Sequence, residues 1–119
     1  MGYIGIVDYG AGNLMSVSKA LDFLGLENKI VTNPDLMEQA SGIVLPGVGA
    51  FPDAMQALAE SGLTQSLIHA AKTRPFLGIC LGAQMLFEES DEMHLTKGLG
   101  LLPGRVQRIE TDLKLPQIG

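Results

Sequence analysis

A single cysteine, Cys80, is the strongest candidate for a reactive group in this chain of 119 residues. It lies in the middle of residues 78–82, which read Gly-Ile-Cys-Leu-Gly. This is the Gly-x-nucleophile-x-Gly pattern, in which a sharp turn from a strand into a helix exposes a nucleophile above a sheet. A free cysteine is otherwise most often a buried core residue. The glycines on both sides favour a nucleophile that attacks an amide or an ester.

Such a nucleophile needs backbone N–H groups that stabilise the negative charge forming on the attacked carbonyl oxygen. In this type of turn one donor belongs to the residue after the nucleophile, which here is Leu81. A second donor must come from a neighbouring loop. Residues 46–49, Pro-Gly-Val-Gly, follow an apolar run, and their glycines allow backbone orientations that aim an N–H into the site. Taken alone, this stretch would indicate a plain strand-to-helix turn.

Alternating strands and helices must position these two bends. Short apolar runs rich in β-branched residues predict buried strands, and apolar residues three and four positions apart predict helices. The predicted strands are residues 3–7, 29–32, 42–45, 75–79 and, at or near the sheet edge, 105–109. The predicted helices are residues 14–24, 36–40, 52–62, 64–72 and 81–89. This order predicts an α/β fold with a doubly wound, mostly parallel sheet, helices on both faces, and ligands at the carboxyl ends of the strands.

Composition and charge restrict the class of protein. Apolar residues make up 46% of the chain, enough for a core, and no apolar run reaches the roughly 18 residues of a membrane helix. The net charge of −5, without a lysine or arginine cluster, argues against nucleic acid or anionic membrane as a partner. One cysteine cannot form an internal disulfide, which agrees with a reducing compartment. We expect a soluble, cytoplasmic protein that uses no metal and no cofactor.

Three segments in this order resemble the class I glutamine amidotransferases. They are the opening residues 6–14 (Ile-Val-Asp-Tyr-Gly-Ala-Gly-Asn-Leu), residues 46–51 (Pro-Gly-Val-Gly-Ala-Phe), and residues 78–88, which contain the cysteine. The opening is similar to that of one branch, the glutaminase subunits of imidazole glycerol phosphate synthase in histidine biosynthesis. Residues 115–119, Leu-Pro-Gln-Ile-Gly, are similar to a Leu-Pro-His-Met-Gly stretch of that branch. The resemblance therefore extends along the whole chain.

The resemblance implies a reaction on L-glutamine. Cys80 would attack the side-chain amide, release ammonia and form a γ-glutamyl thioester that water cleaves. The ammonia would pass to a (β/α)8-barrel cyclase subunit that makes imidazole glycerol phosphate. The implied oxyanion and substrate-binding residues are Gly47, Val48, Gly49, Leu81, Gln84 and Glu92. The implied contacts with the cyclase are Gly10, Asn13, Pro116 and Gln117.

The sequence positions of Gln84 and Glu92 support their implied roles to different degrees. Gln84 follows Cys80 by four residues, so a helix would place both on one face. Glu92 has a second interpretation, as one charge of the solvated acidic run at residues 88–92.

One part of the family pattern is missing. The family places a base and its orienting carboxylate, as His-x-Glu, downstream of the cysteine, and the 119 residues contain no such pair. We do not expect either His69, on a predicted helix, or His94, in a polar loop, to replace it. Residues 1–119 are therefore predicted to be an incomplete amidotransferase domain that is inactive alone, since triads lose activity by orders of magnitude when a member is removed.

Two alternatives remain at this point. One is the glutaminase subunit of another synthase, such as that for anthranilate, aminodeoxychorismate or carbamoyl phosphate, against which only the opening segment argues. The other is a non-catalytic α/β module that uses the same fold to bind a partner, and the missing His-x-Glu pair is its main support.

Overall fold

The computed structural model of the protein describes residues 2–107. Its centre is a four-stranded sheet in the order β2-β1-β3-β4, and all three pairings are parallel. The strands are β1 (Ile4–Val7), β2 (Asn28–Val31), β3 (Gly42–Leu45) and β4 (Phe76–Gly78). The helices of the described residues are α1 (Leu14–Phe23), α2 (Pro34–Gln39), α3 (Phe51–Ser61), α4 (Thr64–Thr73) and α5 (Leu81–Gln84).

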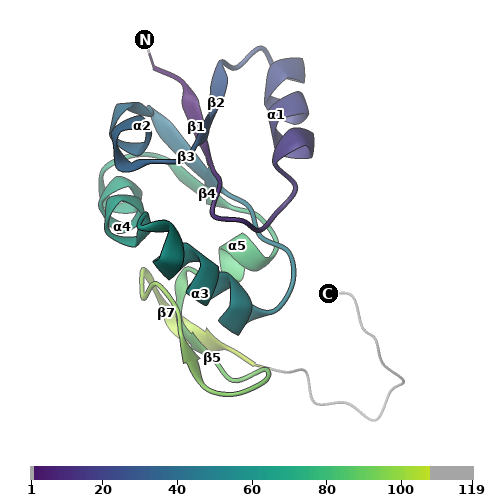
Figure 1. Cartoon of the computed structure of the whole chain (residues 1–119), viewed down its shortest axis with the longest axis vertical. Coiled ribbons are helices and arrows are strands. Elements are labelled where there is room, and N and C mark those ends of the chain that lie inside the picture. The colour runs from purple at the N-terminus through teal and green to yellow at the C-terminus, as the bar shows by residue number, and fades with distance from the viewer. Residues whose placement is uncertain (1, 108–119) are drawn as a thin grey trace.

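The helices cover both faces of this sheet. Figure 1 shows α1 on one side and α2 and α4 together on the other, where α2 and α4 also contact each other. The predicted α/β fold with a parallel sheet between helices is therefore confirmed. Among the described helices, none is long and apolar enough to cross a membrane.

Local signals explain where the helices begin and end. Asn33 caps α2, because its side-chain oxygen accepts a hydrogen bond from the backbone N–H of Leu36 at 2.9 Å, and a proline follows at the first helical position. α3 ends at Gly62, whose φ of 77° is the left-handed conformation that glycine adopts without a steric penalty.

The two faces of the sheet are not equally covered. On the side of α2, α3 and α4, strand residues such as Val7, Val31 and Leu45 are fully buried in one apolar core. α1 has no fully buried residue. Leu77, in the outermost strand β4, keeps 57% of its surface exposed, and no described residue pairs with the outer side of that strand. In the described part of the chain, the face covered by α1 is therefore packed less completely than the other face.

A second, smaller sheet corrects two predictions. It consists of β5 (Phe87–Ser90), β6 (Thr96–Lys97) and β7 (Leu102–Val106), in the order β6-β5-β7. The helix predicted over residues 81–89 was wrong beyond residue 84, since residues 87–90 form a strand. The strand predicted over residues 105–109 begins earlier, at residue 102, and joins this second sheet instead of the edge of the first; residues 108 and 109 lie outside the described residues.

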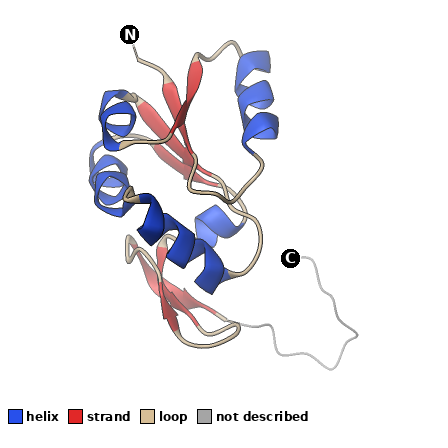
Figure 2. Cartoon of the chain, in the orientation of Figure 1, coloured by secondary structure: helices blue, strands red, loops and turns tan. Residues whose placement is uncertain are grey.

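The correction has a physical reason in backbone hydrogen bonding. The carbonyl oxygen of Leu86 accepts from the N–H groups of Leu101 and Leu102, at 2.8 and 2.9 Å, and that of Glu88 accepts from Gly98 at 2.8 Å. Groups that would have bonded within a helix bond instead to a segment ten or more residues away. Figure 2 shows the small sheet next to α3.

Candidate active site

Cys80 occupies a sharp bend between β4 and α5. Its φ of 54° and ψ of −123° make it the one residue other than glycine with a positive φ among the described residues. Such strained backbone is concentrated at functional sites, where the surrounding structure holds it in place. The side chain is exposed. The predicted strand-to-helix turn at the cysteine is therefore confirmed, although the helix after it ends at Gln84 and not at residue 89.

Contacts of the backbone explain why glycines flank this bend. A Cβ added at Gly78 would lie 2.7 Å from Cα of Ala83, and one added at Gly82 would overlap the carbonyl oxygen of Leu45. The start of α5 thus packs with its backbone directly against the end of β3. No larger residue fits at either position without moving the backbone.

The loop of residues 46–49 lies directly against this bend. A Cβ added at Gly47 would lie 2.7 Å from the backbone nitrogen of Gly82 and 3.0 Å from Cβ of Leu81. Gly49 has a φ of 107°, which is a glycine conformation, and Val48 between them is exposed. The two bends that the sequence predicts to cooperate are therefore neighbours at the carboxyl ends of β3 and β4.

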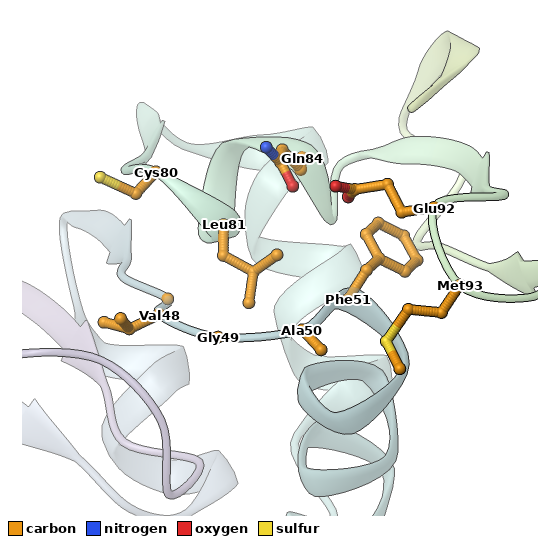
Figure 3. Close-up of a pocket in the computed structure, with 10 residues that line it drawn as sticks. Val48, Gly49, Ala50, Phe51, Cys80, Leu81, Gln84, Glu92 and Met93 are labelled. Atoms are coloured by element: carbon orange, nitrogen blue, oxygen red, sulfur yellow. The ribbon is translucent and has the colours of Figure 1, made fainter. Parts of the chain in front are cut away.

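A pocket of about 620 Å³ opens between these two bends and the small sheet. Figure 3 shows Cys80 at one end, near Val48, and Gln84 with Glu92 at the other. The lining residues are Gly47, Val48, Gly49, Ala50, Phe51, Cys80, Leu81, Gln84, Glu92 and Met93. Every residue for which the sequence analysis expects an oxyanion or substrate-binding role thus borders the same pocket as the cysteine.

Gln84 and Glu92 reach the pocket from different elements. Gln84 lies in α5, and its backbone N–H donates to the carbonyl oxygen of Cys80 at 3.3 Å. Glu92 follows β5, and its backbone N–H donates to Oγ of Ser90 at 3.3 Å. Ser90 is buried, so it anchors the start of the loop that carries Glu92. The carboxylate of Glu92 extends toward Gln84 (Figure 3).

Some of the pocket's wall was not predicted from the sequence. Phe51 is buried at the start of α3 and lines the pocket, and Met93 lines it from the loop after β5. Phe51 belongs to the motif at residues 46–51, which was a signal that could have been used. Nothing in the sequence indicates Met93, because its position depends on the second sheet.

The remaining candidates lie elsewhere. His69, in α4, and His94 are both exposed, and neither lines the pocket. Gly10 is exposed with a φ of 93°, while the side chain of Asn13 caps α1 by accepting from Ser16 N–H at 3.2 Å. Among the described residues no three His, Cys, Asp or Glu side chains form a group that could hold a metal ion. The two other candidate interface residues, Pro116 and Gln117, lie outside the described residues.

Tyr9 is a buried polar neighbour of the site that the sequence analysis did not single out. Its hydroxyl donates to the carbonyl oxygen of Pro46 at 2.7 Å. Burial raises the pKa of Tyr9 from the ordinary value of 10.0 to about 12, because the phenolate would lose its hydration. The hydroxyl therefore keeps its proton, and remains a donor, at neutral pH.

Comparison with known proteins agrees with this geometry. The family model described as glutamine amidotransferase class-I matches residues 5–111. The chain belongs to the class I glutamine amidotransferase family. The solved structure titled "Crystal structure of glutamine amidotransferase" superposes with a TM-score of 0.75 at 25% identity, over 90% of this chain and 57% of that one. A peptidase E protein from Listeria monocytogenes EGD-e has a TM-score of 0.67 at 14% identity, over 85% of this chain and 63% of that one, which shows the fold alone.

Two similar proteins carry the same functional name. The chain is 56% identical over 117 residues to imidazole glycerol phosphate synthase subunit HisH of Desulfitobacterium hafniense strain DSM 10664 / DCB-2, covering 98% of this chain and 56% of that protein. It is 52% identical to the subunit of the same name from Listeria innocua, covering 96% of this chain and 56% of that protein. The chain therefore spans little more than half the length of the curated relatives that it matches.

Proposed function

We propose that this chain is the nucleophile-bearing part of the glutaminase subunit of imidazole glycerol phosphate synthase. The observation that carries the proposal is the exposed Cys80 on a strained bend, in backbone contact with the glycine-rich loop at residues 46–49. Its relatives named above favour this branch over the glutaminases of other synthases.

In the proposed reaction the thiolate of Cys80 attacks the side-chain amide carbon of L-glutamine. The amide nitrogen takes a proton and leaves as ammonia, and a γ-glutamyl thioester remains on the sulfur. Water then cleaves the thioester, which releases glutamate and restores the thiol. The backbone N–H groups of Leu81 and of Val48 or Gly49 are suited to stabilise the oxyanion of each step, and losing one such donor typically lowers kcat by about 10²- to 10³-fold.

The other end of the pocket suits the amino-acid end of glutamine. Glu92 is the one anionic side chain among the lining residues, so its carboxylate matches the positive α-amino group of the substrate. Gln84 beside it offers both a donor and an acceptor. The distance between the two ends of the pocket then selects a substrate whose amide lies several bonds from its amino group.

We further propose that residues 1–119 form an incomplete domain. The pocket is lined by no histidine in the described part of the chain, and the relatives are nearly twice as long. A base supplied by further chain would complete the site, and the 119 residues alone are expected to be inactive. The ammonia would serve a (β/α)8-barrel cyclase in a cytoplasmic heterodimer, where a free catalytic thiol stays reduced. Gly10, Asn13, Pro116 and Gln117 are proposed to contact that cyclase.

The test compares the full-length protein, with the cyclase present, and the 119-residue chain. Glutamate release from L-glutamine is expected from the full-length protein and not from the 119 residues. The glutamine analogue diazo-oxo-norleucine should label Cys80 in the full-length protein, and Cys80→Ser should abolish both label and activity. A full-length protein that neither binds the analogue nor hydrolyses glutamine would instead be a non-catalytic module.

A further inference from the structure

Tyr9 connects the end of β1 to the loop after β3. Only 4% of its surface is exposed, and its hydroxyl donates to the carbonyl oxygen of Pro46, 37 residues away in sequence, at 2.7 Å. The same hydroxyl lies 3.4 Å from Sδ of Met85, the residue that ends α5. One buried side chain therefore contacts both the loop after β3 and the end of α5, the helix that follows the cysteine bend.

The hydrogen bond acts on a rigid unit. The carbonyl group of Pro46 and the N–H of Gly47 belong to one planar peptide, so holding the oxygen fixes the orientation of the whole plane. Gly47 is also closely packed against Tyr9 and the backbone of Gly82. A Cβ added to it would lie 2.8 Å from the tyrosine oxygen and 2.7 Å from the nitrogen of Gly82. The first peptide of the loop is thus hydrogen-bonded to the tyrosine and packed against the cysteine bend.

We propose that Tyr9 is a positioning residue of the glutaminase site, whose hydroxyl fixes the first peptide of the oxyanion loop at residues 46–49. The role rests on the function proposed above, and it adds a residue that does not line the pocket. Val48 and Gly49, which follow this peptide, are exposed and carry the candidate oxyanion N–H groups. Their direction therefore depends on this peptide at one end of the loop and on the buried start of α3 at the other.

The effect of losing the hydrogen bond between Tyr9 and Pro46 follows from the geometry of oxyanion stabilisation. Donors act when they lie 2.7–3.1 Å from the developing oxyanion, and the ground-state amide depends on them less. Without the hydrogen bond to Tyr9, the first peptide of the loop could rotate. The loop would then hold its N–H groups in the productive orientation for a smaller fraction of the time. We expect kcat to fall by about 10-fold, with KM within about twofold of the original value.

The chain offers a matched control. Tyr3 is its only other tyrosine, equally buried at 6% exposed, and its hydroxyl donates to the carbonyl oxygen of Leu36 at 2.6 Å. It lies just before β1, at the end of the sheet opposite the pocket. Tyr9→Phe and Tyr3→Phe therefore remove the same group from the same kind of bond, and they differ in distance from the site.

The experiment measures both variants in the full-length protein with its cyclase. Besides kcat and KM for glutamine, it follows alkylation of Cys80 by iodoacetamide, a displacement at carbon that forms no oxyanion. Tyr9→Phe should lower kcat about 10-fold and leave the alkylation rate unchanged, while Tyr3→Phe should change neither. Placing p-aminophenylalanine at position 9, which retains an N–H donor, should restore most of kcat and also tests the role if Tyr9→Phe does not fold.

Each other outcome has a definite meaning. Equal kcat values for Tyr9→Phe and Tyr3→Phe, or no recovery with p-aminophenylalanine, would overturn the positioning role. A parallel loss of alkylation and kcat in Tyr9→Phe would do the same, because it would show that the cysteine bend itself had moved. If the unmodified protein shows no glutaminase activity that depends on Cys80, the proposed function fails, and the role of Tyr9 fails with it.

Discussion

The two bends that border the pocket and the small sheet beside them are held together in different ways. At the bends, backbone touches backbone, and Gly47, Gly78 and Gly82 leave no room for a Cβ. On the small sheet, Arg105 forms ion pairs with Glu89 at 2.9 Å and Asp91 at 3.5 Å, with all three side chains partly exposed to solvent.

At the bends, the lack of space for a side chain determines which residues are tolerated. On the small sheet, solvated charges determine which residues are favoured. Close backbone packing holds N–H groups in fixed positions and directions, and catalytic groups need to be held to within about 0.5 Å of the productive geometry. Exposed ion pairs between long side chains are screened by water and contribute little to stability. Substitutions at the bends should therefore have large effects, and substitutions at the surface of the small sheet small ones.

The largest effect is expected from Cys80→Ser in the full-length protein. The weaker oxygen nucleophile should lower glutamine hydrolysis by at least about 10³-fold, because a triad without its nucleophile keeps only the residual catalysis of binding and oxyanion stabilisation. Thermal unfolding should be unchanged, since serine places nearly the same atoms at the same exposed position. Initial rates of glutamate formation check this, and activity clearly above about one thousandth of the original would contradict it.

Gly82→Ala should cost the most stability of any single added methyl group at the bends. Because its Cβ would overlap the carbonyl oxygen of Leu45, the backbones of α5 and β3 must separate, and we expect a loss of more than about 3 kcal/mol in the free energy of unfolding. Urea unfolding of the full-length protein measures this loss.

Gly25→Ala is the matched control for that substitution. Gly25 has a φ of 76° and no atom within 4 Å of an added Cβ, so only the left-handed backbone opposes alanine, at about 1–2 kcal/mol. Equal losses for the two variants would show that the close contact at Gly82 carries no extra energy.

Alkaline pH should lower the free energy of unfolding through the ionisation of Tyr9. Its pKa is about 12 in the folded protein and near 10 when unfolded, so the stabilisation is complete below pH 10 and is lost as the pH rises from 10 to 12, when the unfolded tyrosine ionises first. Two pKa units correspond to about 2–3 kcal/mol. Urea unfolding of Tyr9→Phe and of the original protein at several pH values measures the contribution of Tyr9 alone, because the other ionisable groups are common to both. Parallel curves would contradict it.

The smallest effect is expected from Arg105→Ala. Its ion pairs are exposed, so the free energy of unfolding should fall by less than about 1 kcal/mol, and the loss should shrink further in 1 M salt. Urea unfolding at low and high salt checks both statements. A loss as large as that of Gly82→Ala would remove the distinction between the two regions.

The two bends could be predicted from the sequence, and the small sheet could not. The bend at Cys80 was predictable because its glycines stand next to it in sequence, and the central strands because each is a short apolar run between turn residues. The second sheet was not, since Phe87 and Glu88 look helical by themselves and are extended in the structure, where they accept hydrogen bonds from Gly100 and Gly98. Tyr9 was missed because a hydroxyl that bonds to a carbonyl 37 residues away leaves no local pattern.

The outer side of β4, with which no residue of the described part pairs, has a consequence for how the protein behaves at high concentration. An outermost strand with open main-chain groups and a leucine such as Leu77 facing water is the kind of surface on which sheets from separate molecules join edge to edge. Such joining is second order in protein, so the chain would stay dispersed when dilute and gather into oligomers as it is concentrated.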